Sequence, residues 1–348
     1  MTALPRVVFN ALPLGAGGGV DTYIRELLFA LAPLARAELA AAVQADQAGE
    51  LPPGVRPILT ASCAGWRRAL AGIRGFGAAD LVHGLDVDVP IGHDRPRVAT
   101  VHDLAVFDVP WAFPRRRAAA ERLIVRTALA RADRIIAVSA FTAARVRERF
   151  GLEATVVHEA PGPDMRPPRA DEVDAARAEY ALPEQFVLHV GNIEPRKDVA
   201  TLAEACRIAG LRLVLTGEPL WGTPTPRGCL SLGRVPRARL PALFNAATVV
   251  AYASRYEGFG LPPIEAMACG AAVVTTAVPA VVETVGKGAE LFAAGDVDGL
   301  RRTLVALFAD GERRRQLASE GRSRVSALSW GRTAAETLGV YRSLGIDA

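Results

Sequence analysis

Short apolar runs rich in β-branched residues alternate along this chain with longer amphipathic stretches. The alternation predicts strand–helix units on parallel sheets, because strands covered on both faces are apolar throughout and the connecting helices are not. Before residue 160 the predicted strands are 6–10, 39–43, 80–83, 98–102, 135–139 and 155–158. After residue 168 they are 186–190, 211–216, 248–252 and 272–275. Two such series predict two α/β domains.

The segment between the two series marks the predicted domain boundary. Residues 161–168 contain four prolines, which favour an extended and exposed connection. The chain has 348 residues, enough for two domains that each bury a core. We predict one domain over 1–163 and a second over 164–329, whose last helical stretch, 296–325, breaks near Gly311. A final helix lies in 330–348, and its apolar Trp330, Leu338 and Tyr341 are predicted to pack on the first domain.

Composition excludes several classes of protein. Half of the residues are apolar and 22% are charged, as in ordinary globular domains. The sequence contains no run of about 18 apolar residues, and residues 1–6 lack the charged-then-apolar pattern of a secretory leader. We therefore expect neither a membrane-spanning helix nor a leader, and a cytoplasmic protein. The net charge of +4 comes from arginine, because Lys197 and Lys287 are the only lysines. Basic runs interleaved with aromatic residues, which nucleic-acid binding favours, are absent from the sequence.

The stretch EGFGLPPIE, residues 257–265, carries the clearest chemistry, since it follows a predicted strand and opens a predicted helix. Its two glycines let the backbone approach a ligand closely, and proline is well tolerated at the first helical position. The amides at such a helix start favour an anion, for example a phosphate. Glu257 and Glu265 stand on either side, and each can accept hydrogen bonds from paired hydroxyl groups. A phosphate flanked by two diols describes a nucleotide sugar.

Glu257 and Glu265, separated by seven residues within EGFGLPPIEAMACG, resemble the signature of family 4 retaining glycosyltransferases of the GT-B fold. The mannosyltransferase-like group 1 members are the most similar. Five further motifs resemble those of the family and occur in the same order along the chain: GGGV at 17–20, HD at 102–103, AVS at 137–139, GNIEPRK at 191–197 and VPAVVE at 278–283. The resemblance covers nearly the whole chain. It implies two Rossmann-like domains facing a cleft, with a C-terminal helix crossing back to the N-terminal domain.

The resemblance also implies a role for each donor-site residue. Glu257 should contact hydroxyls of the donor sugar, and Glu265 should hold the ribose. Lys197 and Arg196 should neutralise the pyrophosphate, in keeping with the negative charge that develops when a nucleoside diphosphate departs. The remaining donor-binding residues are Gly258, Phe259, Gly260, Leu261, Gly191 and Asn192. Many relatives carry an arginine where this chain has Asn192, and Arg196 is expected to supply that charge.

The first domain is expected to supply the acceptor side. His102 should lie near the donor sugar and is expected to form the catalytic set with Glu257, Lys197 and Arg196. Gly17, Gly18, Gly19 and Asp103 should border the acceptor and the cleft. The GGG run follows a strand, but Val20 stands where a dinucleotide-binding fingerprint has its third glycine, so a dehydrogenase is not expected.

The implied reaction moves a hexose from a nucleotide diphosphate sugar to a hydroxyl acceptor with retention, and it requires neither a metal nor another cofactor. The IEPRK and HDLAVFDVP segments resemble mannosyltransferases of polysaccharide assembly, which favours GDP-mannose as donor and polysaccharide or glycolipid assembly as context. Two alternatives remain: a nucleotide-sugar epimerase or hydrolase on the same fold, and a catalytically silent partner subunit.

Arg115, Arg122 and Arg126 fall on one face of a predicted helix. This face is either ordinary solvated surface or a contact for anionic lipid or a diphosphate-linked acceptor. The second interpretation implies a lipid-linked glycan acceptor and peripheral association with the inner membrane face.

Overall fold

The computed structural model describes residues 4–61, 77–90 and 94–348, and the chain divides into two compact units. The first contains Met1–Phe107, Arg115–Glu159 and Ser329–Ala348, and the second contains Asp108–Pro114 and Ala160–Leu328. The proline-rich segment 161–168 thus lies at the start of the second unit.

The grouping of Asp108–Pro114 with the second unit was not expected from the sequence. Within that unit the Tyr256 hydroxyl donates a hydrogen bond to Asp108 Oδ2 at 3.0 Å. The ring of Phe113 lies beside that of Trp221, with centroids 5.3 Å apart. Both contacts are made to residues more than 100 positions away in the sequence, and they help to hold the short segment in the second unit.

A seven-stranded parallel sheet forms the centre of the first unit, in the order β3-β2-β1-β4-β5-β6-β7. The strands are β1 (Arg6–Asn10), β2 (Glu38–Gln44), β3 (Val55–Thr60), β4 (Leu81–Gly84), β5 (Arg97–Val101), β6 (Arg134–Ala137) and β7 (Thr155–Val156). The order reverses between β1 and β4, and at such switch points parallel sheets bind ligands beyond the carboxyl ends of their strands. All but β3 were predicted from the sequence. This edge strand has exposed residues and contains Pro57, so it lacks the continuous apolar run.

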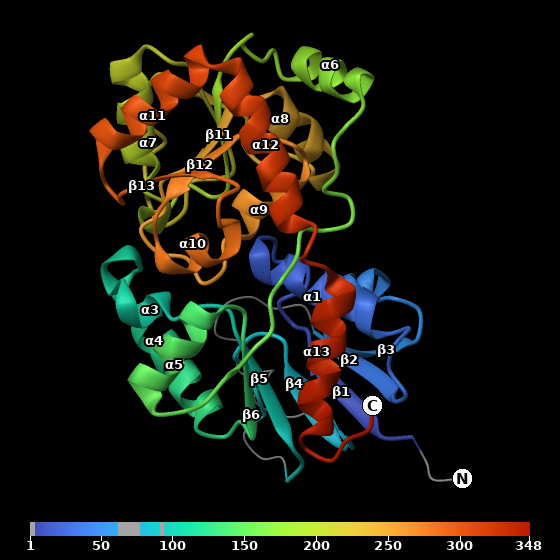
Figure 1. Ribbon diagram of the computed structural model, residues 1–348. Coiled ribbons are helices and arrows are strands. Elements are labelled where there is room, and N and C mark those ends of the chain that lie inside the picture. The colour runs from blue at the N-terminus through green and yellow to red at the C-terminus, as the bar shows by residue number, and fades with distance from the viewer. Residues whose placement is uncertain (1–3, 62–76, 91–93) are drawn as a thin grey trace. The chain divides into compact units, whose positions relative to one another are not determined.

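Helices flank this sheet (Figure 1). They are α1 (Gly19–Leu31), α3 (Ala105–Asp108), α4 (Arg115–Leu129), α5 (Ala140–Phe150) and α13 (Trp330–Arg342), with a short 3-10 turn at Ala45–Glu50. A second 3-10 turn, Pro110–Ala112, belongs to the second unit. The first helix buries Tyr23, Ile24, Leu27, Leu28 and Leu31, the spacing of an amphipathic helix facing a core. Ser139 caps α5 by accepting a hydrogen bond from the Thr142 amide.

The C-terminal helix returns to the first unit, which confirms the fold expected from the resemblance. α13 packs beside α1 (Figure 1). The Thr333 hydroxyl donates to the His158 carbonyl at 2.7 Å, and Tyr341 Oη lies 2.7 Å from His83 Nδ1. Trp330 reaches Tyr23, with ring centroids 6.0 Å apart.

The second unit is built around a six-stranded parallel sheet in the order β10-β9-β8-β11-β12-β13. Its strands are β8 (Val187–Val190), β9 (Leu213–Thr216), β10 (Leu230–Ser231), β11 (Val249–Tyr252), β12 (Val273–Thr276) and β13 (Glu290–Phe292). The sequence did not indicate the two short edge strands β10 and β13. The order reverses between β8 and β11, which places the switch point between the loops that follow these two strands.

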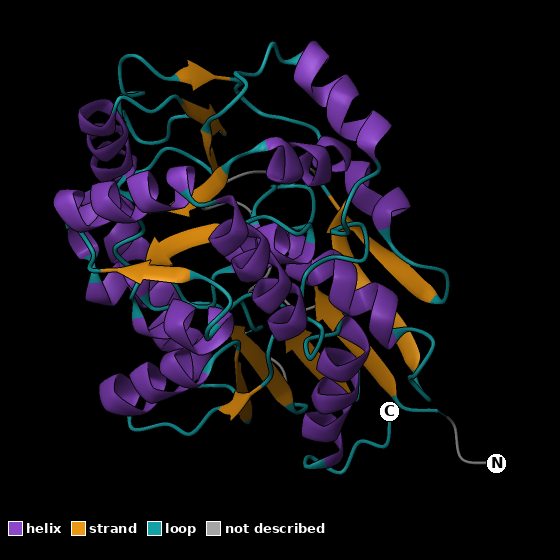
Figure 2. Cartoon of the chain, turned by 45° about the horizontal axis from the view of Figure 1, so that its top comes forward, coloured by secondary structure: helices purple, strands orange, loops and turns teal. Residues whose placement is uncertain are grey.

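Helices pack around these strands as well, as Figure 2 shows. They are α6 (Ala170–Glu179), α7 (Val199–Ala209), α8 (Leu240–Ala246), α9 (Leu261–Ala268), α10 (Pro279–Val285), α11 (Val297–Ala309) and α12 (Gly311–Val325), with 3-10 turns at Pro195–Lys197 and Arg237–Arg239. The predicted break near Gly311 is confirmed, and Asp310 caps α12 there. Throughout the described part of the chain, each helix is too short or too polar to cross a lipid bilayer.

Candidate active site

The switch point of the second unit brings three of the predicted catalytic residues together. Glu257 follows β11, whereas Arg196 and Lys197 belong to the 3-10 turn after β8. Lys197 Nζ donates to Glu257 Oε1 at 2.6 Å, and Arg196 Nη1 donates to Glu257 Oε2 at 3.0 Å. The Glu257 carboxylate is therefore held by one cation on each oxygen.

The charges of this cluster fix the ionisation of Glu257. Burial raises the pKa of its carboxyl group, but the nearby charges of Lys197 and Arg196 outweigh burial and lower the pKa to about 2. At neutral pH Glu257 is thus an ionised acceptor and not a proton donor. Arg196 also donates to Glu194 Oε1 at 2.9 Å and to the Tyr256 carbonyl at 3.1 Å. Arg196 is thus shared between two carboxylates.

The loop after β8 also contains Gly191 and Asn192. Gly191 has φ 140°, and a Cβ at Gly217 would lie 2.2 Å from the Gly191 carbonyl oxygen, so the two glycine loops cross in close contact. Asn192 Oδ1 accepts a hydrogen bond from the Glu218 amide at 3.4 Å. This side chain therefore helps to join the two loops.

The turn before α9 depends on a glycine at its last position. Gly260 is the N-cap residue with φ 96° and ψ 50°, a left-handed conformation that favours glycine. The Thr284 hydroxyl donates a hydrogen bond to the Phe259 carbonyl at 3.0 Å and so links the turn to α10. Because Pro262 and Pro263 lack an N–H, the amides at this helix start that can face an anion are those of Gly260 and Leu261.

Glu265, the predicted ribose ligand, lies on α9 and is 6% exposed. Arg237 Nη1 donates to its Oε1 at 3.1 Å. The same guanidinium binds both oxygens of Asp164, at 2.9 and 3.0 Å. Arg237 and Asp164 were missed by the sequence reasoning, since one arginine among many and one linker aspartate give no distinct signal. The structure thus pairs each signature glutamate with basic side chains.

In the first unit, His102 and Asp103 follow β5. His102 Nδ1 lies 3.1 Å from Glu159 Oε1, and its Nε2 lies 2.9 Å from the Leu85 carbonyl oxygen. Burial lowers the pKa of His102, but the hydrogen bond and charge of Glu159, with smaller contributions from Asp86 and the Leu85 carbonyl, raise it to about 9. Sequence reasoning did not identify Glu159.

Asp103 and the glycine run have local structural roles in this unit. Asp103 Oδ1 accepts a hydrogen bond from the Ala105 amide at 2.8 Å and so caps the turn into α3. Gly17 and Gly18 have φ 77° and 84°, and Gly18 is the N-cap of α1, which begins at Gly19. A Cβ on Gly18 would meet no atom within 4 Å, so its conformation, and not crowding, calls for glycine.

The predicted arginine face of α4 is partly used within the protein. Arg122, Arg126 and Arg149 surround the Phe107 ring, with guanidinium carbons 5.3–5.9 Å from its centroid. Arg122 Nε also donates to the Val106 carbonyl at 2.7 Å. Arg115, by contrast, is exposed at the start of the helix.

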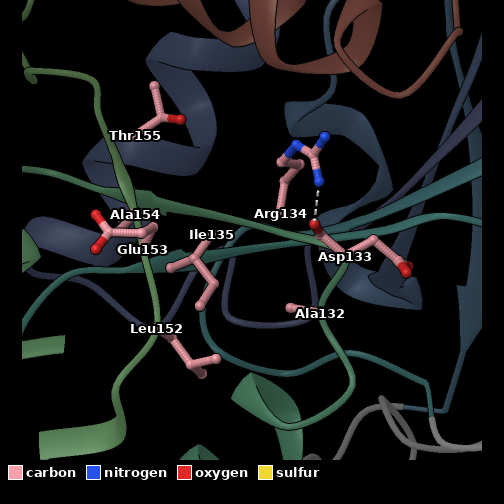
Figure 3. Close-up of a pocket in the computed structure, with 8 residues that line it drawn as sticks. All are labelled: Ala132, Asp133, Arg134, Ile135, Leu152, Glu153, Ala154 and Thr155. Carbon is pink, nitrogen blue, oxygen red and sulfur yellow. Dashed lines mark hydrogen bonds between the residues drawn. The ribbon is translucent and has the colours of Figure 1, made fainter. Parts of the chain in front are cut away.

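The first unit also contains a pocket of about 430 Å³, whose lining residues are drawn in Figure 3. Its lining comes from residues 132–135 and 152–155, at the amino ends of β6 and β7. Ligands of parallel sheets bind at the opposite, carboxyl ends, where His102 lies. Within residues 4–61, 77–90 and 94–348, no cluster of three or more His, Cys, Asp or Glu side chains could hold a metal ion.

Comparisons with known proteins match both units. Residues 17–162 match the profile of glycosyltransferase family 4, and residues 172–324 match that of glycosyl transferases group 1. O-antigen chain mannosyltransferase B of Escherichia coli is 29% identical over 284 residues, 76% of this chain and 74% of that protein. D-inositol 3-phosphate glycosyltransferase of Kineococcus radiotolerans is 31% identical over 299 residues, 73% of this chain and 66% of that protein. The chain matches only 31% of the length of another relative, the E. coli serotype-specific mannosyltransferase WbdA.

Solved structures share the fold over nearly the whole chain. Sucrose-phosphate synthase from Thermosynechococcus elongatus has a TM-score of 0.81 at 24% identity, covering 99% of this chain and 100% of that one. The Anabaena protein HepE in complex with UDP and glucose has a TM-score of 0.77 at 18% identity, with coverage of 97% and 100%. Together with the two profile matches, these similarities identify the chain as a glycosyltransferase of the GT-B fold that belongs to the group 1 glycosyltransferases of family 4.

Proposed function

We propose that this glycosyltransferase transfers a hexose, with retention, from GDP-mannose to a hydroxyl acceptor during polysaccharide or glycolipid assembly. The observation that carries the proposal is the cluster of Glu257, Lys197 and Arg196 beside the left-handed turn at Gly260. The choice of mannose is supported by the names of two E. coli relatives, both mannosyltransferases.

The roles of the donor-site residues follow from their charges. Lys197 has three N–H donors, and the one that binds Glu257 leaves two that can reach a pyrophosphate. Arg196 adds a second positive charge, and the amides of Gly260 and Leu261 add dipoles that favour an anion. These groups supply the charge stabilisation for which other transferases use a metal, so we propose that no metal or other cofactor is required.

Glu265 is proposed to accept hydrogen bonds from the ribose hydroxyls. Its present partner, Arg237, is held through two hydrogen bonds by Asp164 and can therefore stay in place while Glu265 turns to the ribose. Glu257, with a pKa of about 2, is suited to accept hydrogen bonds from hydroxyls of the transferred sugar.

A front-face displacement fits these groups better than a covalent glycosyl-enzyme intermediate. Both oxygens of Glu257 are ion-paired, which makes this carboxylate a poor nucleophile. We propose instead that the leaving phosphate oxygen takes the proton of the acceptor hydroxyl as that hydroxyl attacks the same face of the sugar. Lys197 and Arg196 then stabilise the departing diphosphate.

A panel of nucleotides tests the donor assignment through thermal unfolding. A ligand present at 100 times its dissociation constant stabilises the folded state by about 2.7 kcal/mol, so the true donor should raise the Tm most. We expect GDP-mannose and GDP to raise it more than the uridine and adenosine counterparts do. A larger shift with UDP-sugars would reject GDP-mannose. Turnover of donor without any acceptor would instead favour the hydrolase or epimerase.

Two neutralising substitutions should separate the roles of the signature glutamates. Glu257→Gln should lower kcat while keeping affinity for GDP, because it alters contacts to the sugar and leaves the cations in place. Glu265→Gln should weaken GDP binding, by roughly tenfold, which corresponds to about 1.4 kcal/mol. Calorimetry with GDP and steady-state kinetics measure the two effects. Loss of GDP affinity in Glu257→Gln with normal affinity in Glu265→Gln would reverse the assignment.

The acceptor is proposed to be a lipid-linked glycan presented at the inner membrane face. Support comes from the exposed basic start of α4, where Arg115, Arg116 and Arg117 are exposed and Leu123 is 67% exposed. Sedimentation with anionic vesicles tests this peripheral contact, and equal recovery with neutral vesicles counts against it.

A further inference from the structure

The ring of His102 is enclosed by acceptors on both nitrogens. Its Nε2 lies 2.9 Å from the Leu85 carbonyl, and because a carbonyl oxygen only accepts, Nε2 must carry a hydrogen. Its Nδ1 lies 3.1 Å from Glu159 Oε1, and the Glu159 side chain is 4% exposed. If the ring were neutral with its proton on Nε2, the lone pair of Nδ1 would point at the Glu159 carboxylate. The lone pair and the carboxylate oxygen would repel each other unless a proton lay between the two atoms.

The other groups around the ring favour placing that proton on His102. Asp86, in the loop after β4, acts on the ring with a negative charge. Tyr23 from α1 meets the ring edge-on at 4.7 Å, and its hydroxyl, hydrogen-bonded to Thr100, is uncharged because burial raises its pKa. His83 on β4 is also uncharged, since burial lowers its pKa to about 3. The charged groups that act on His102 here are therefore acidic.

We propose that Glu159 is a positioning residue that holds His102 as an imidazolium with both N–H groups bound to the protein, so that His102 acts as a fixed cation and not as a proton acceptor. This inference rests on the proposed transferase function and goes beyond it, because it assigns His102 a charge and Glu159 a role. The raised pKa of His102, about 9, agrees with the geometry.

A fixed cation has two consequences for the reaction. His102 cannot take the acceptor proton, since neither ring nitrogen has a lone pair to offer, which leaves that proton to the leaving phosphate oxygen. Its charge lies at the carboxyl edge of β5, the edge at which parallel sheets bind ligands, and favours an anionic diphosphate substrate. Glu159 acts only through His102.

Nuclear magnetic resonance of the histidine ring nitrogens tests the proposal without reference to substrate. In the wild-type protein, His102 should carry two N–H groups at pH 7.5 and titrate above pH 8, while His83 stays neutral. In Glu159→Gln the titration of His102 should move down by at least two pH units. Glu153→Gln, an exposed glutamate just before β7, is the matched control and should leave the titration unchanged. A neutral His102 at pH 7 in the wild type, or an unshifted one in Glu159→Gln, overturns the proposal.

The pH dependence of kcat separates this role from a merely structural one. Because Glu159→Gln lowers the pKa of His102 in the folded protein, the variant should lose the imidazolium charge as the pH rises. Its kcat should therefore fall at least tenfold between pH 6 and 8. The wild type should show no such fall, and Glu159→Asp should restore the wild-type profile in part. A flat profile for Glu159→Gln overturns the role. If the donor assignment itself is wrong, GDP-mannose will give no turnover while the His102 titration remains high, and the profiles are then measured with the donor that the thermal panel selects.

Discussion

Lys197→Ala is expected to lower kcat by about 100- to 1,000-fold while leaving the protein folded. One lost contact to a developing anion typically costs about 2.7–4 kcal/mol of transition-state stabilisation. Lys197 binds one oxygen of Glu257, so its loss also leaves this buried carboxylate with Arg196 as its remaining basic partner among the hydrogen bonds described above. The pKa of Glu257 should rise in the variant, because the charge of Lys197 is the larger of the two that lower it. Steady-state kinetics with saturating donor measures the effect on kcat.

The chain offers a matched control, because it contains one other lysine. Lys287 is exposed and lies after α10, and Lys287→Ala should leave kcat within twofold of the wild type. Equal Tm values for the two variants would exclude unfolding as the cause of lost activity. Activity of Lys197→Ala within threefold of the wild type would show that its ammonium group does not stabilise the leaving diphosphate.

The sequence was sufficient for the fold because the central strands of a parallel sheet are buried on both faces. Such strands stand out from their surroundings, as β11 does, which is apolar throughout, and β1, whose centre is the apolar run Val7–Phe9. The edge strands β3, β10 and β13 are short or partly exposed, so they carry no comparable pattern. The placement of Asp108–Pro114 depends on contacts with Tyr256 and Trp221, which no local pattern encodes.

The candidate site likewise has features that the sequence could predict and features that it could not. The resemblance placed Glu257 and Lys197 in one site, and the structure brings them to 2.6 Å. The resemblance could not indicate that the two side chains pair with each other. That pairing depends on how two loops about 60 residues apart in the sequence are positioned. The pairing of Arg237 with Glu265 was hidden because 39 of the 41 basic residues (41 less two lysines) are arginine. Glu159 was missed because its importance comes from His102, 57 residues earlier.

Removal of the C-terminal helix should have the largest effect on folding. If the helix only returned the chain to the first unit, a chain ending at Ser329 would keep two folded domains and lose mainly turnover. The structure argues for a stronger effect, because α13 buries Trp330, Leu338, Val340 and Tyr341 in the first unit. Burial of such side chains contributes about 1.5–3 kcal/mol each. Their sum is comparable to the ~5–15 kcal/mol that typically separates folded from unfolded domains.

The truncated chain should therefore unfold in its first unit and keep its second. Loss of Tyr341 leaves His83 Nδ1 without its hydroxyl partner, and loss of α13 uncovers the side of α1 that it packs against. Hydrogen exchange should show α1 and β4 unprotected, while β11 and β12 remain protected. GDP should still bind, because Glu257, Lys197 and Glu265 all belong to the second unit. Unchanged protection of α1 in the truncated chain would mean that the first unit forms its core without this helix. Any loss of turnover would then come from the absence of α13 itself and not from unfolding.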